Sequence, residues 1–372
     1  MKILLIAPLD PKAPTKLKLL IGGENTYSQT LLKFHPPKIY FVHFTNALKK
    51  GEISYHWSYY LCLWLQKLRI LPMGPRVYAF KINGNFDLIY AHADPIKIIG
   101  SKIPVVISNS SSDIVFSKYY QQLPLWRISI YQNIKKIIFK ILGIIDGEVN
   151  QQNTKIFVFS KWAKKIKNQL QIKDCQVIYP GLHINVLKRK INKSKSVKIL
   201  FAGVWFERKG GRILLKAFRK LSRKFPDIKL KILGELPADI HILPDENISQ
   251  HNFVSYTQLK KYYSNHDILV HAPIKVEGYG MVVPEAMAHR MTIIVSKVCA
   301  LEEFIIHNQS GLVVKPNSAI ALELALKKLI KKPKLRYKMG NLAYLRFQQM
   351  FSIRVFNKQL SAFFRDALKN QN

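Results

Sequence analysis

The chain has 372 residues, of which 48% are hydrophobic, so it is long enough to fold as two domains with separate cores. Its 59 Lys and Arg against 22 Asp and Glu give a formal net charge of +37, which predicts attraction to polyanions such as nucleic acid or anionic lipid. The composition argues against a membrane-spanning protein, since no apolar run reaches roughly 18 residues, and three scattered cysteines support neither a disulfide framework nor a zinc site.

Short apolar runs alternate with segments of helical period through the first half of the chain, a pattern typical of βαβ units and a parallel sheet. The opening MKILLIAPLDPKAP is too short and too soon broken by prolines for a signal peptide, so we expect the chain to stay in the cytoplasm. The runs that predict strands are KILLIAP, KIYFVHF, FDLIYAH, PVVISNS, KIFVFS and QVIYP.

Two segments of this half combine aromatic residues with lysine and arginine. Residues 55–76 contain no acidic residue, and residues 123–145 repeat the pattern with Lys135, Lys136 and Lys140. Trp and Tyr beside Lys are typical of segments at the headgroup level of a membrane, so we expect peripheral attachment to the inner, anionic face. The alternative is a pair of ordinary helices with solvated lysines. Nucleic acid is not an expected partner, because only charge and no binding motif points to it.

A polar, lysine-rich stretch over 186–196 is predicted to link a first domain, residues 1–185, to a second, residues 197–351. In the second domain the strand pattern restarts with KILFAG, KLKILG, ISQHNF, ILVHAP and TIIVSK. The predicted fold class is therefore α/β, with two Rossmann-like domains built on parallel sheets. An amphipathic helix is expected near the end, over 352–372.

The most informative stretch is EGYGMVVPEAMAHR, in which seven residues separate Glu277 from Glu285. Carboxylates accept hydrogen bonds only, so this pair suits a ligand that offers several hydroxyls, as a sugar nucleotide does. Gly278 and Gly280 let the backbone approach such a ligand, and Pro284 fits the first turn of a helix. The alternative is a plain loop and helix whose glutamates are favoured by the helix dipole.

This stretch resembles the E-x(7)-E signature of the family 4 retaining glycosyltransferases, which have the GT-B fold. Upstream, KILFAGVWFERKGGRILLKAFRKL is similar to the family's strand, phosphate loop and first helix of the donor domain, and TIIVSKVCALEEFIIHNQSGLVVKP is similar to the stretch that closes the donor site. MKILLIAPLD and GGENTYSQTLLK resemble the start of the first domain more faintly. The resemblance covers nearly all of the chain and is strong over 198–316.

The resemblance implies two Rossmann-like domains facing across a cleft, with the final helix packed back on the first. It implies transfer of a sugar from a nucleoside-diphosphate sugar to a saccharide or lipid-linked acceptor, with retention of configuration, as a hexosyltransferase of cell-envelope polysaccharide synthesis. The sequence contains no D-x-D pair to hold a metal on the diphosphate, so we expect no cofactor and no required metal.

By the resemblance, Lys209 and Arg208 hold the diphosphate, Glu285 accepts hydrogen bonds from the ribose, and Glu277 faces the transferred sugar. Lys209 lies in the ERKGG turn, where glycines permit close approach and a helix is expected to start. Glu277, Lys209 and His92 are the candidate catalytic residues. The residues expected against the donor are Gly203, Arg208, Lys209, Gly278, Tyr279, Gly280, Met281 and Glu285.

Besides Arg290 and Thr292, which stand where the family more often has a glycine and a proline, the chain departs from the family pattern at two positions of the predicted site. Val204 stands where the family commonly has the arginine of its Arg and Lys pair, and Asn109 stands where a first-domain histidine would align. His92, at a predicted strand end, is the candidate replacement for that histidine, with a packed structural histidine as the alternative. Gly22 and Gly23 resemble the first-domain glycines that approach acceptor and donor phosphate.

These departures leave other functions open. One is a catalytically impaired GT-B protein that binds carbohydrate or nucleotide, and another is a polyanion-binding protein. A phosphorylase of this fold would need a pyridoxal phosphate lysine in a much longer chain, and a sugar-nucleotide epimerase would need acid and base groups that the sequence does not offer. The nucleotide base, the sugar and the acceptor do not follow from the sequence.

Overall fold

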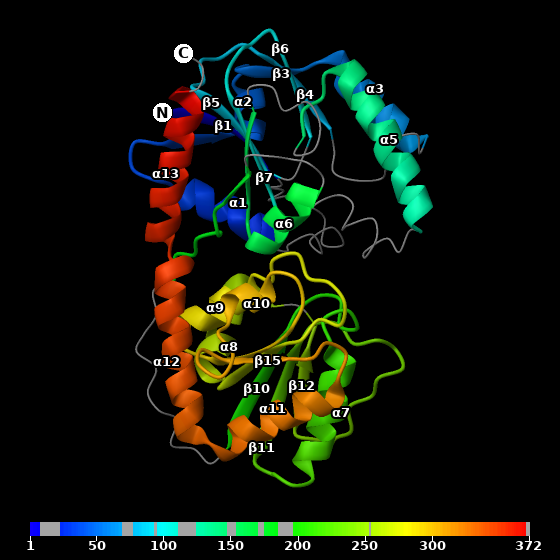
Figure 1. Ribbon diagram of the computed structural model, residues 1–372, viewed down its shortest axis with the longest axis vertical. Helices are drawn as coiled ribbons and strands as arrows, with labels where there is room; N and C mark the ends of the chain where they lie inside the picture. Colours follow the sequence, from blue (N-terminus) through cyan, green and yellow to red (C-terminus); the bar gives the residue numbers. More distant parts are fainter. Residues whose placement is uncertain are drawn as a thin grey trace. The chain divides into compact units, whose positions relative to one another are not determined.

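The structure is a computed structural model, and it describes residues 1–7, 23–68, 77–92, 95–110, 124–146, 154–169, 175–184, 196–252 and 254–369 (Figure 1). The chain divides into two compact units, Met1–Gly181 with Ile353–Asn372, and Leu182–Ser352. The sequence-based boundary was placed a few residues later, and the predicted linker lies outside the described residues except for Ser196.

Unit 1 is built on a six-stranded sheet in the order β2-β1-β5-β7-β8-β9, and every neighbouring pair is parallel. Each of the six predicted runs overlaps one of these strands. The strands are β1 Lys2–Ile6, β2 Tyr40–His43, β5 Leu88–His92, β7 Val105–Asn109, β8 Thr154–Val158 and β9 Cys175–Val177. The helices of the unit are α1 Gly23–Lys33, α2 Phe44–Lys49, α3 Trp57–Lys67, α5 Leu125–Leu142, α6 Lys161–Gln169 and α13 Ile353–Lys369.

Helix α13 packs on unit 1 although it follows unit 2 in the sequence. The Phe364 ring lies 5.6 Å from Tyr90 of β5, and the Asn357 amide donates to the carbonyl of Phe34 at 2.9 Å. A Cβ at Gly181 would lie 2.4 Å from the Cβ of Phe356, so only glycine lets the chain pass this close to α13.

A second, three-stranded sheet in unit 1 is missing from the sequence prediction. It consists of β3 Ile53–Tyr55, β4 Tyr78–Ile82 and β6 Ile96–Ile99, with β3 antiparallel to β4 and β4 parallel to β6. β3 pairs antiparallel with β4, and β5 of the six-stranded sheet lies between β4 and β6 in the chain, so these strands do not follow the pattern of successive parallel βαβ units. The aromatic residues of this region, Tyr55, Tyr78 and Phe80, pack against one another rather than marking a ligand site.

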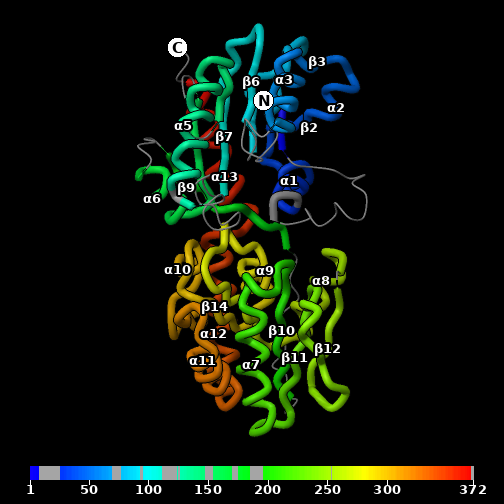
Figure 2. The backbone as a smooth tube through the Cα atoms, turned by 90° about the vertical axis from the view of Figure 1, so that its right-hand side faces the viewer, coloured from blue at the N-terminus to red at the C-terminus, as the bar shows by residue number. Residues whose placement is uncertain are grey.

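Unit 2 has a six-stranded parallel sheet in the order β12-β11-β10-β13-β14-β15. The short β15 is the one strand of this sheet that the sequence did not predict. The strands are β10 Val197–Ala202, β11 Ile228–Leu233, β12 Ile248–His251, β13 Ile268–His271, β14 Thr292–Ser296 and β15 Leu312–Val314. The helices are α7 Gly211–Ser222, α8 Tyr256–Asn265, α9 Val282–Ala288, α10 Leu301–Phe304, α11 Ala319–Lys331 and α12 Pro333–Met350. Figure 2 shows β10, β11 and β12 side by side, with α7 and α8 beside them.

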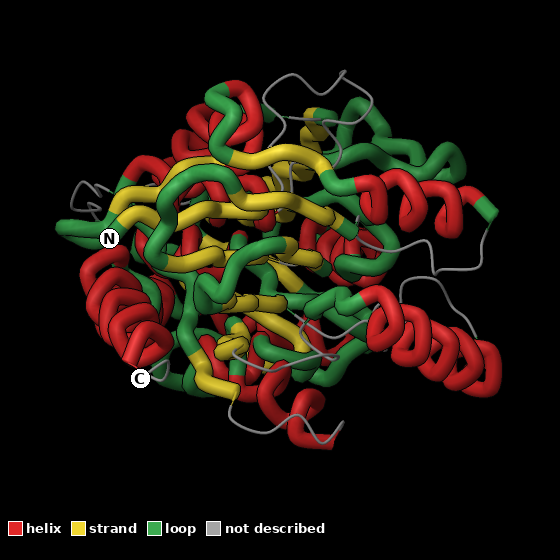
Figure 3. Tube along the Cα trace, turned by 90° about the horizontal axis from the view of Figure 1, so that it is seen from above, coloured by secondary structure: helices red, strands yellow, loops and turns green. Residues whose placement is uncertain are grey.

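Helices lie around the strands (Figure 3), as the α/β pattern predicts. Along β10, the alternate residues Ile199 and Phe201 pack under α7 and α11, where Leu214, Phe218 and Leu326 complete the core. The structure therefore confirms an α/β fold with two parallel-sheet domains. In unit 2 the loops at the carboxyl ends of β10 and β13 carry most of the predicted site.

Candidate functional site

The turn between β10 and α7 is shaped by two glycines. A Cβ on Gly203 would come within 2.5 Å of the Lys209 side chain, so this glycine leaves room for the lysine to lie across the strand end. Gly210 has φ +81°, and a Cβ there would lie 2.0 Å from the carbonyl oxygen of Ala272. The turn therefore needs both glycines to bring Lys209 beside the loop that follows β13.

Helix α7 begins immediately after this turn, at Gly211, and no side chain caps its N-terminus. Backbone N–H groups at the start of a helix lack intrahelical partners and carry a partial positive charge. The turn therefore combines a lysine, an arginine and a helix N-terminus, which is an arrangement suited to phosphate.

Arg208, Lys209 and His271 gather around one oxygen of Glu277. The Arg208 Nη1 donates to Oε2 of Glu277 at 3.2 Å and to the carbonyl of Val276 at 2.8 Å. The Lys209 Nζ lies 3.9 Å and the His271 Nε2 3.3 Å from the same oxygen. Two cations and one carboxylate leave one net positive charge in this cluster, which we call the Glu277 cluster.

The pKa of Glu277 reflects two opposing effects. Burial raises it, but Lys209, the adjacent His271 ring and the charge of Arg208 together outweigh burial and hold the pKa well below its usual range. The pKa of His271 is lowered, mainly by burial and also by Lys209 and Arg208, although Glu277 acts in the opposite direction. Near neutral pH the cluster therefore holds an ionised Glu277 beside a neutral His271.

Glu285 lies in the first turn of α9 and has different neighbours. Its side chain is buried, and the Tyr263 hydroxyl on α8 donates to its Oε2 at 2.7 Å. Burial raises the pKa of Glu285 to about 7, an effect that the Tyr263 hydrogen bond and the charges of Lys260 and Lys209 only partly offset. Since Lys209 is among the charges acting on Glu285, the two carboxylates share one lysine in their surroundings.

The loop between the two glutamates turns tightly at Gly280, where φ is +75°. The Tyr279 ring is buried against Phe304, with ring centroids 4.8 Å apart, so its aromatic side chain is a packing element. Met281 is the N-cap residue that immediately precedes α9. Any contribution of the stretch Gly278–Met281 to a ligand would therefore come chiefly from its backbone.

The site residues predicted in unit 1 have surroundings that support a ligand-binding role less well than those of unit 2. His92 is fully buried, its Nδ1 lies 2.7 Å from the Ser108 hydroxyl, and its ring stacks on Phe159. This environment fits the packed alternative, and we leave His92 out of the proposed site. Asn109 ends β7, and its buried Oδ1 has no hydrogen-bond partner among the described residues. Gly23 begins α1, and Gly22 lies outside the described residues.

Sequence reasoning missed two residues of the site, His271 and Tyr263. His271 is the last residue of β13, a strand that the sequence predicted. Because ligands bind at the carboxyl ends of parallel strands, this position could have marked His271 as a site residue. Tyr263 lies in a helix of mixed polarity, where no local pattern distinguishes a core tyrosine from one that donates to a carboxylate.

Two features are absent from the part of the chain that the structure describes. No three His, Cys, Asp or Glu side chains are grouped so that they could hold a metal ion. In the same residues, no helix is both long and apolar enough to span a bilayer.

Residues 184–346, nearly all of unit 2, match the model of the family Glycosyl transferases group 1. Unit 2 is therefore similar to the group 1 glycosyltransferases over nearly its whole length. The match includes both glutamates of the predicted signature and the Arg208–Lys209 turn, so the Glu277 cluster belongs to the matched domain.

Two similar proteins are also described as glycosyltransferases. An uncharacterized glycosyltransferase of Haemophilus influenzae is 26% identical over 190 residues, which cover 48% of this chain and 51% of that protein. A D-inositol 3-phosphate glycosyltransferase of Pseudarthrobacter chlorophenolicus is 31% identical over 163 residues, covering 40% of this chain and 38% of that protein. The chain thus aligns with about half or less of the length of each of these relatives.

Solved structures extend the similarity to both units. The structure of Anabaena HepE in complex with UDP and glucose is 13% identical, with a TM-score of 0.62 over 98% of this chain and 100% of that one. A sucrose-phosphate synthase of Thermosynechococcus elongatus is 14% identical, with a TM-score of 0.65 over 100% of both chains. At this identity the likeness establishes the fold alone, and that fold is GT-B.

Proposed function

We propose that the protein transfers a sugar from a nucleoside-diphosphate sugar to a saccharide or lipid-linked acceptor, with retention of configuration and without a metal ion. The observation that carries the proposal is the Glu277 cluster beside the uncapped start of α7. This is a net positive site at the carboxyl ends of parallel strands, where ligands bind in such sheets. It lies in the domain that matches the group 1 family model.

The cluster suits the charge that develops during transfer. As the glycosidic bond breaks, negative charge grows on the leaving diphosphate, so cations and helix N–H groups directed at it stabilise the transition state more than the ground state. Lys209 and the N-terminus of α7 are assigned this task. Arg208, already bonded to Glu277 and to a backbone carbonyl, fixes the turn and contributes its charge, in place of the arginine that Val204 replaces.

Glu277 and Glu285 take the hydroxyl-binding roles. The described contacts of the Glu277 carboxylate are all to Oε2, so Oε1 is the atom that we assign to a hydroxyl of the transferred sugar. Glu285, when ionised, accepts from the ribose hydroxyls while Tyr263 holds its other oxygen. A nucleoside diphosphate as the donor's leaving group also agrees with the UDP and glucose present in the HepE structure.

A thermal-shift series with UDP, GDP, ADP and their glucose conjugates tests donor binding. A ligand present at about 100 times its Kd stabilises the native state by about 2.7 kcal/mol, which is readily measured. We expect one base to stabilise the protein in the presence of EDTA. The absence of stabilisation by every nucleoside diphosphate would contradict the proposal, and a strict need for magnesium or manganese would remove its metal-independent part. The anomer of the product, read by NMR, tests retention.

The second candidate is a GT-B protein that binds the nucleotide sugar without transferring it. Val204 in place of the family arginine and Asn109 in place of the family histidine favour it. The same binding series followed by a hydrolysis assay separates the two, because donor turnover, even with water as acceptor, requires the catalytic form. Peripheral attachment to an anionic membrane is also part of our proposal, since a lipid-linked acceptor would lie there.

A further inference from the structure

Helix α3 exposes a stripe of large apolar side chains. Trp57, Tyr60 and Trp64, followed by Leu68 at the helix end, are separated by three, four and four positions. Because an α-helix has about 3.6 residues per turn, these separations bring the four side chains to the same side. Their exposed fractions lie between 50% and 63%, which is unusual for residues of this size.

Helix α5 carries a second stripe of the same kind. Trp126, Ile130, Ile137 and Ile141 are separated by four, seven and four positions, so they too share one side of their helix. Their exposed fractions run from 50% to 77%. Three of the four tryptophans that the described residues expose lie on these two stripes, so the stripes are not a random scatter of surface apolar residues.

The opposite sides of both helices are already occupied. Cys62 and Leu65 of α3 and Phe139 and Leu142 of α5 share one hydrophobic cluster, in which the two helices pack together. Lys135, also on the inner side of α5, is buried in an ion pair with Asp146 at 2.6 Å. The exposed stripes are therefore second apolar faces, additional to the faces that hold the fold together.

The charge around the stripes has one sign. Neither α3 nor α5 contains an acidic residue, whereas Lys67, Arg127, Lys136 and Lys140 are exposed on them. Apolar and aromatic side chains bordered by Lys and Arg match a bilayer with anionic headgroups, where rings insert at the interface and cations bind phosphate. A protein partner would need to bring an equal excess of carboxylates to the same area.

We propose that the two stripes and their bordering cations, together the α3–α5 surface, dock unit 1 onto an anionic lipid bilayer. The aromatic rings and isoleucines enter the headgroup region, and the lysines select anionic lipid. This proposal does not rest on sugar transfer, because the α3–α5 surface belongs to unit 1 and the Glu277 cluster to unit 2. Either proposal can therefore fail while the other still holds.

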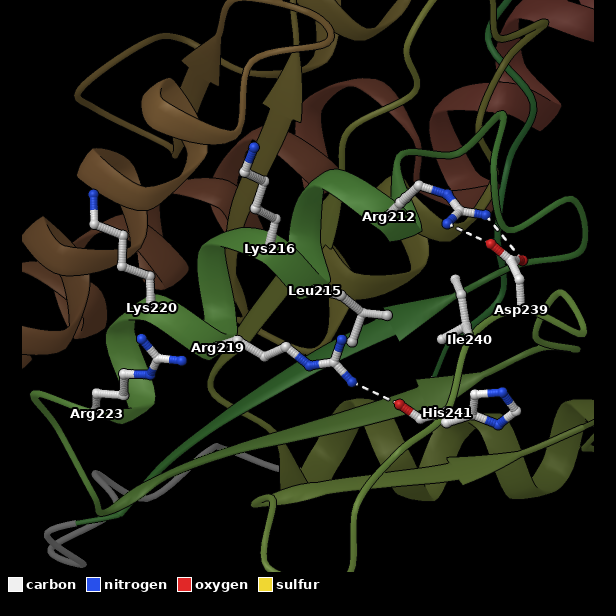
Figure 4. A pocket seen from close by; sticks show the side chains of 9 residues that line it. All are labelled: Arg212, Leu215, Lys216, Arg219, Lys220, Arg223, Asp239, Ile240 and His241. Atoms are coloured by element: carbon white, nitrogen blue, oxygen red, sulfur yellow. Dashed lines mark hydrogen bonds and ion pairs between the residues drawn. The ribbon is translucent and has the colours of Figure 1, made fainter.

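A basic groove on α7 is the competing candidate for binding a polyanion (Figure 4). It has a volume of about 480 Å³ and is lined by Arg212, Lys216, Arg219, Lys220 and Arg223. However, Arg212 already pairs with Glu207 and Asp239, and Arg219 pairs with Glu246. The groove is largely neutralised by its own carboxylates and has no apolar stripe, so the α3–α5 surface is the better match for lipid.

Vesicle flotation of the full chain tests the proposal. Vesicles of phosphatidylcholine alone are compared with vesicles containing phosphatidylglycerol, for the wild type and for the triple variant Trp126→Ser, Ile137→Ser, Ile141→Ser. We expect binding to the anionic vesicles only, and a loss of at least about tenfold in the partition coefficient of the triple variant, because each large side chain adds to the binding. The matched control is Ile320→Ser with Leu324→Ser, two exposed apolar residues of α11 in unit 2, and it should bind like the wild type.

Circular dichroism melts of all three proteins show whether the variants fold. Equal binding of the wild type to neutral and anionic vesicles would overturn the proposal, as would unchanged binding by a folded triple variant. Self-association of the wild type that the triple variant abolishes, in the absence of lipid binding, would assign the surface to a second copy of the chain instead. Binding to single-stranded nucleic acid but not to vesicles would also overturn it.

Discussion

Glu277 and Glu285 belong to one sequence motif and are both buried, yet their surroundings are opposite. Glu277 meets Arg208, Lys209 and His271 at a single oxygen, and its pKa is lowered. Glu285 meets a neutral tyrosine, and its pKa is raised to about 7. The difference shows that the motif fixes the residue type, whereas neighbours from other elements fix the charge that each carboxylate carries.

The different surroundings imply different roles for the two carboxylates. An ionised Glu277 holds two cations in place, so its region is organised before any ligand arrives. Glu285 gains its charge only near neutral pH, so its region depends on pH or on a ligand that stabilises the ionised form. Substitutions around Glu277 and substitutions around Glu285 should therefore differ in the size and pH dependence of their effects.

The largest effect is expected for Lys209→Met. This change removes the cation that we assign to the leaving diphosphate, and loss of one such group typically costs about 10²–10³ in rate. The measurement is kcat/KM for donor turnover, with binding of the nucleoside diphosphate beside it. Lys216→Met is the matched control, since Lys216 is an exposed lysine on α7, the helix that follows the Lys209 turn, and it should retain wild-type turnover. Equal effects of the two changes would show that general positive charge matters rather than the Glu277 cluster.

Glu277→Gln should reduce stability as well as turnover. The substitution leaves Arg208 and Lys209 side by side without a counterion, and an uncompensated group in such a site costs about 1–3 kcal/mol. Because the pKa of Glu277 is lowered in the folded state, its contribution is present above the unfolded value of about 4.3 and is lost as pH falls through the folded pKa. Urea unfolding at pH 7 and at pH 4 measures this contribution. The difference in free energy of unfolding between the variant and the wild type should be smaller at pH 4. A gap that widens on acidification would contradict the ion-pair account.

Much of the fold and of the site that holds the two glutamates could be predicted from the sequence. The parallel sheets, the glycine turn and the pairing of Lys209 with the Glu277 loop depend on strong local patterns and on the rule that strand ends meet at one edge. His271 and Tyr263 did not follow, because their roles arise from contacts between elements far apart in the chain. The three-stranded sheet of unit 1 was also missed, although its strands are as long as those of the six-stranded sheet, because β3 pairs antiparallel with β4 and these strands do not follow the βαβ pattern.

Glu285→Gln should change the pH dependence rather than abolish folding. A carboxyl whose pKa is raised from about 4.3 in the unfolded chain to about 7 binds its proton more tightly when folded, so wild-type stability falls as pH rises between these values. Glutamine cannot ionise, and its oxygen can still accept from Tyr263. The melting temperature of the variant relative to the wild type should therefore increase from pH 5 to pH 8. A constant difference across this range would show that Glu285 does not titrate there.

Donor binding should respond to the same titration. Ribose hydroxyls donate to ionised Glu285, so affinity for the nucleoside diphosphate is expected to rise as pH increases through about 7 in the wild type. In Glu285→Gln this rise should disappear while the contribution of Lys209 persists. Calorimetric titrations at pH 6 and pH 8 give the comparison. A rise of equal size in the variant would assign the pH dependence to another group.

Tyr263→Phe is expected to have the smallest effect and isolates the hydrogen bond itself. The substitution keeps the buried ring and removes only the hydroxyl that lies 2.7 Å from Oε2 of Glu285, at a cost of about 0.5–1.5 kcal/mol. Since this hydrogen bond lowers the pKa of Glu285, its loss should move the midpoint of pH-dependent donor binding upward. Tyr262→Phe on the same helix is the control, because Tyr262 makes no described contact with Glu285 and should leave the midpoint unchanged. A midpoint that stays in place in Tyr263→Phe would mean that burial alone, and not the tyrosine, sets the charge of Glu285.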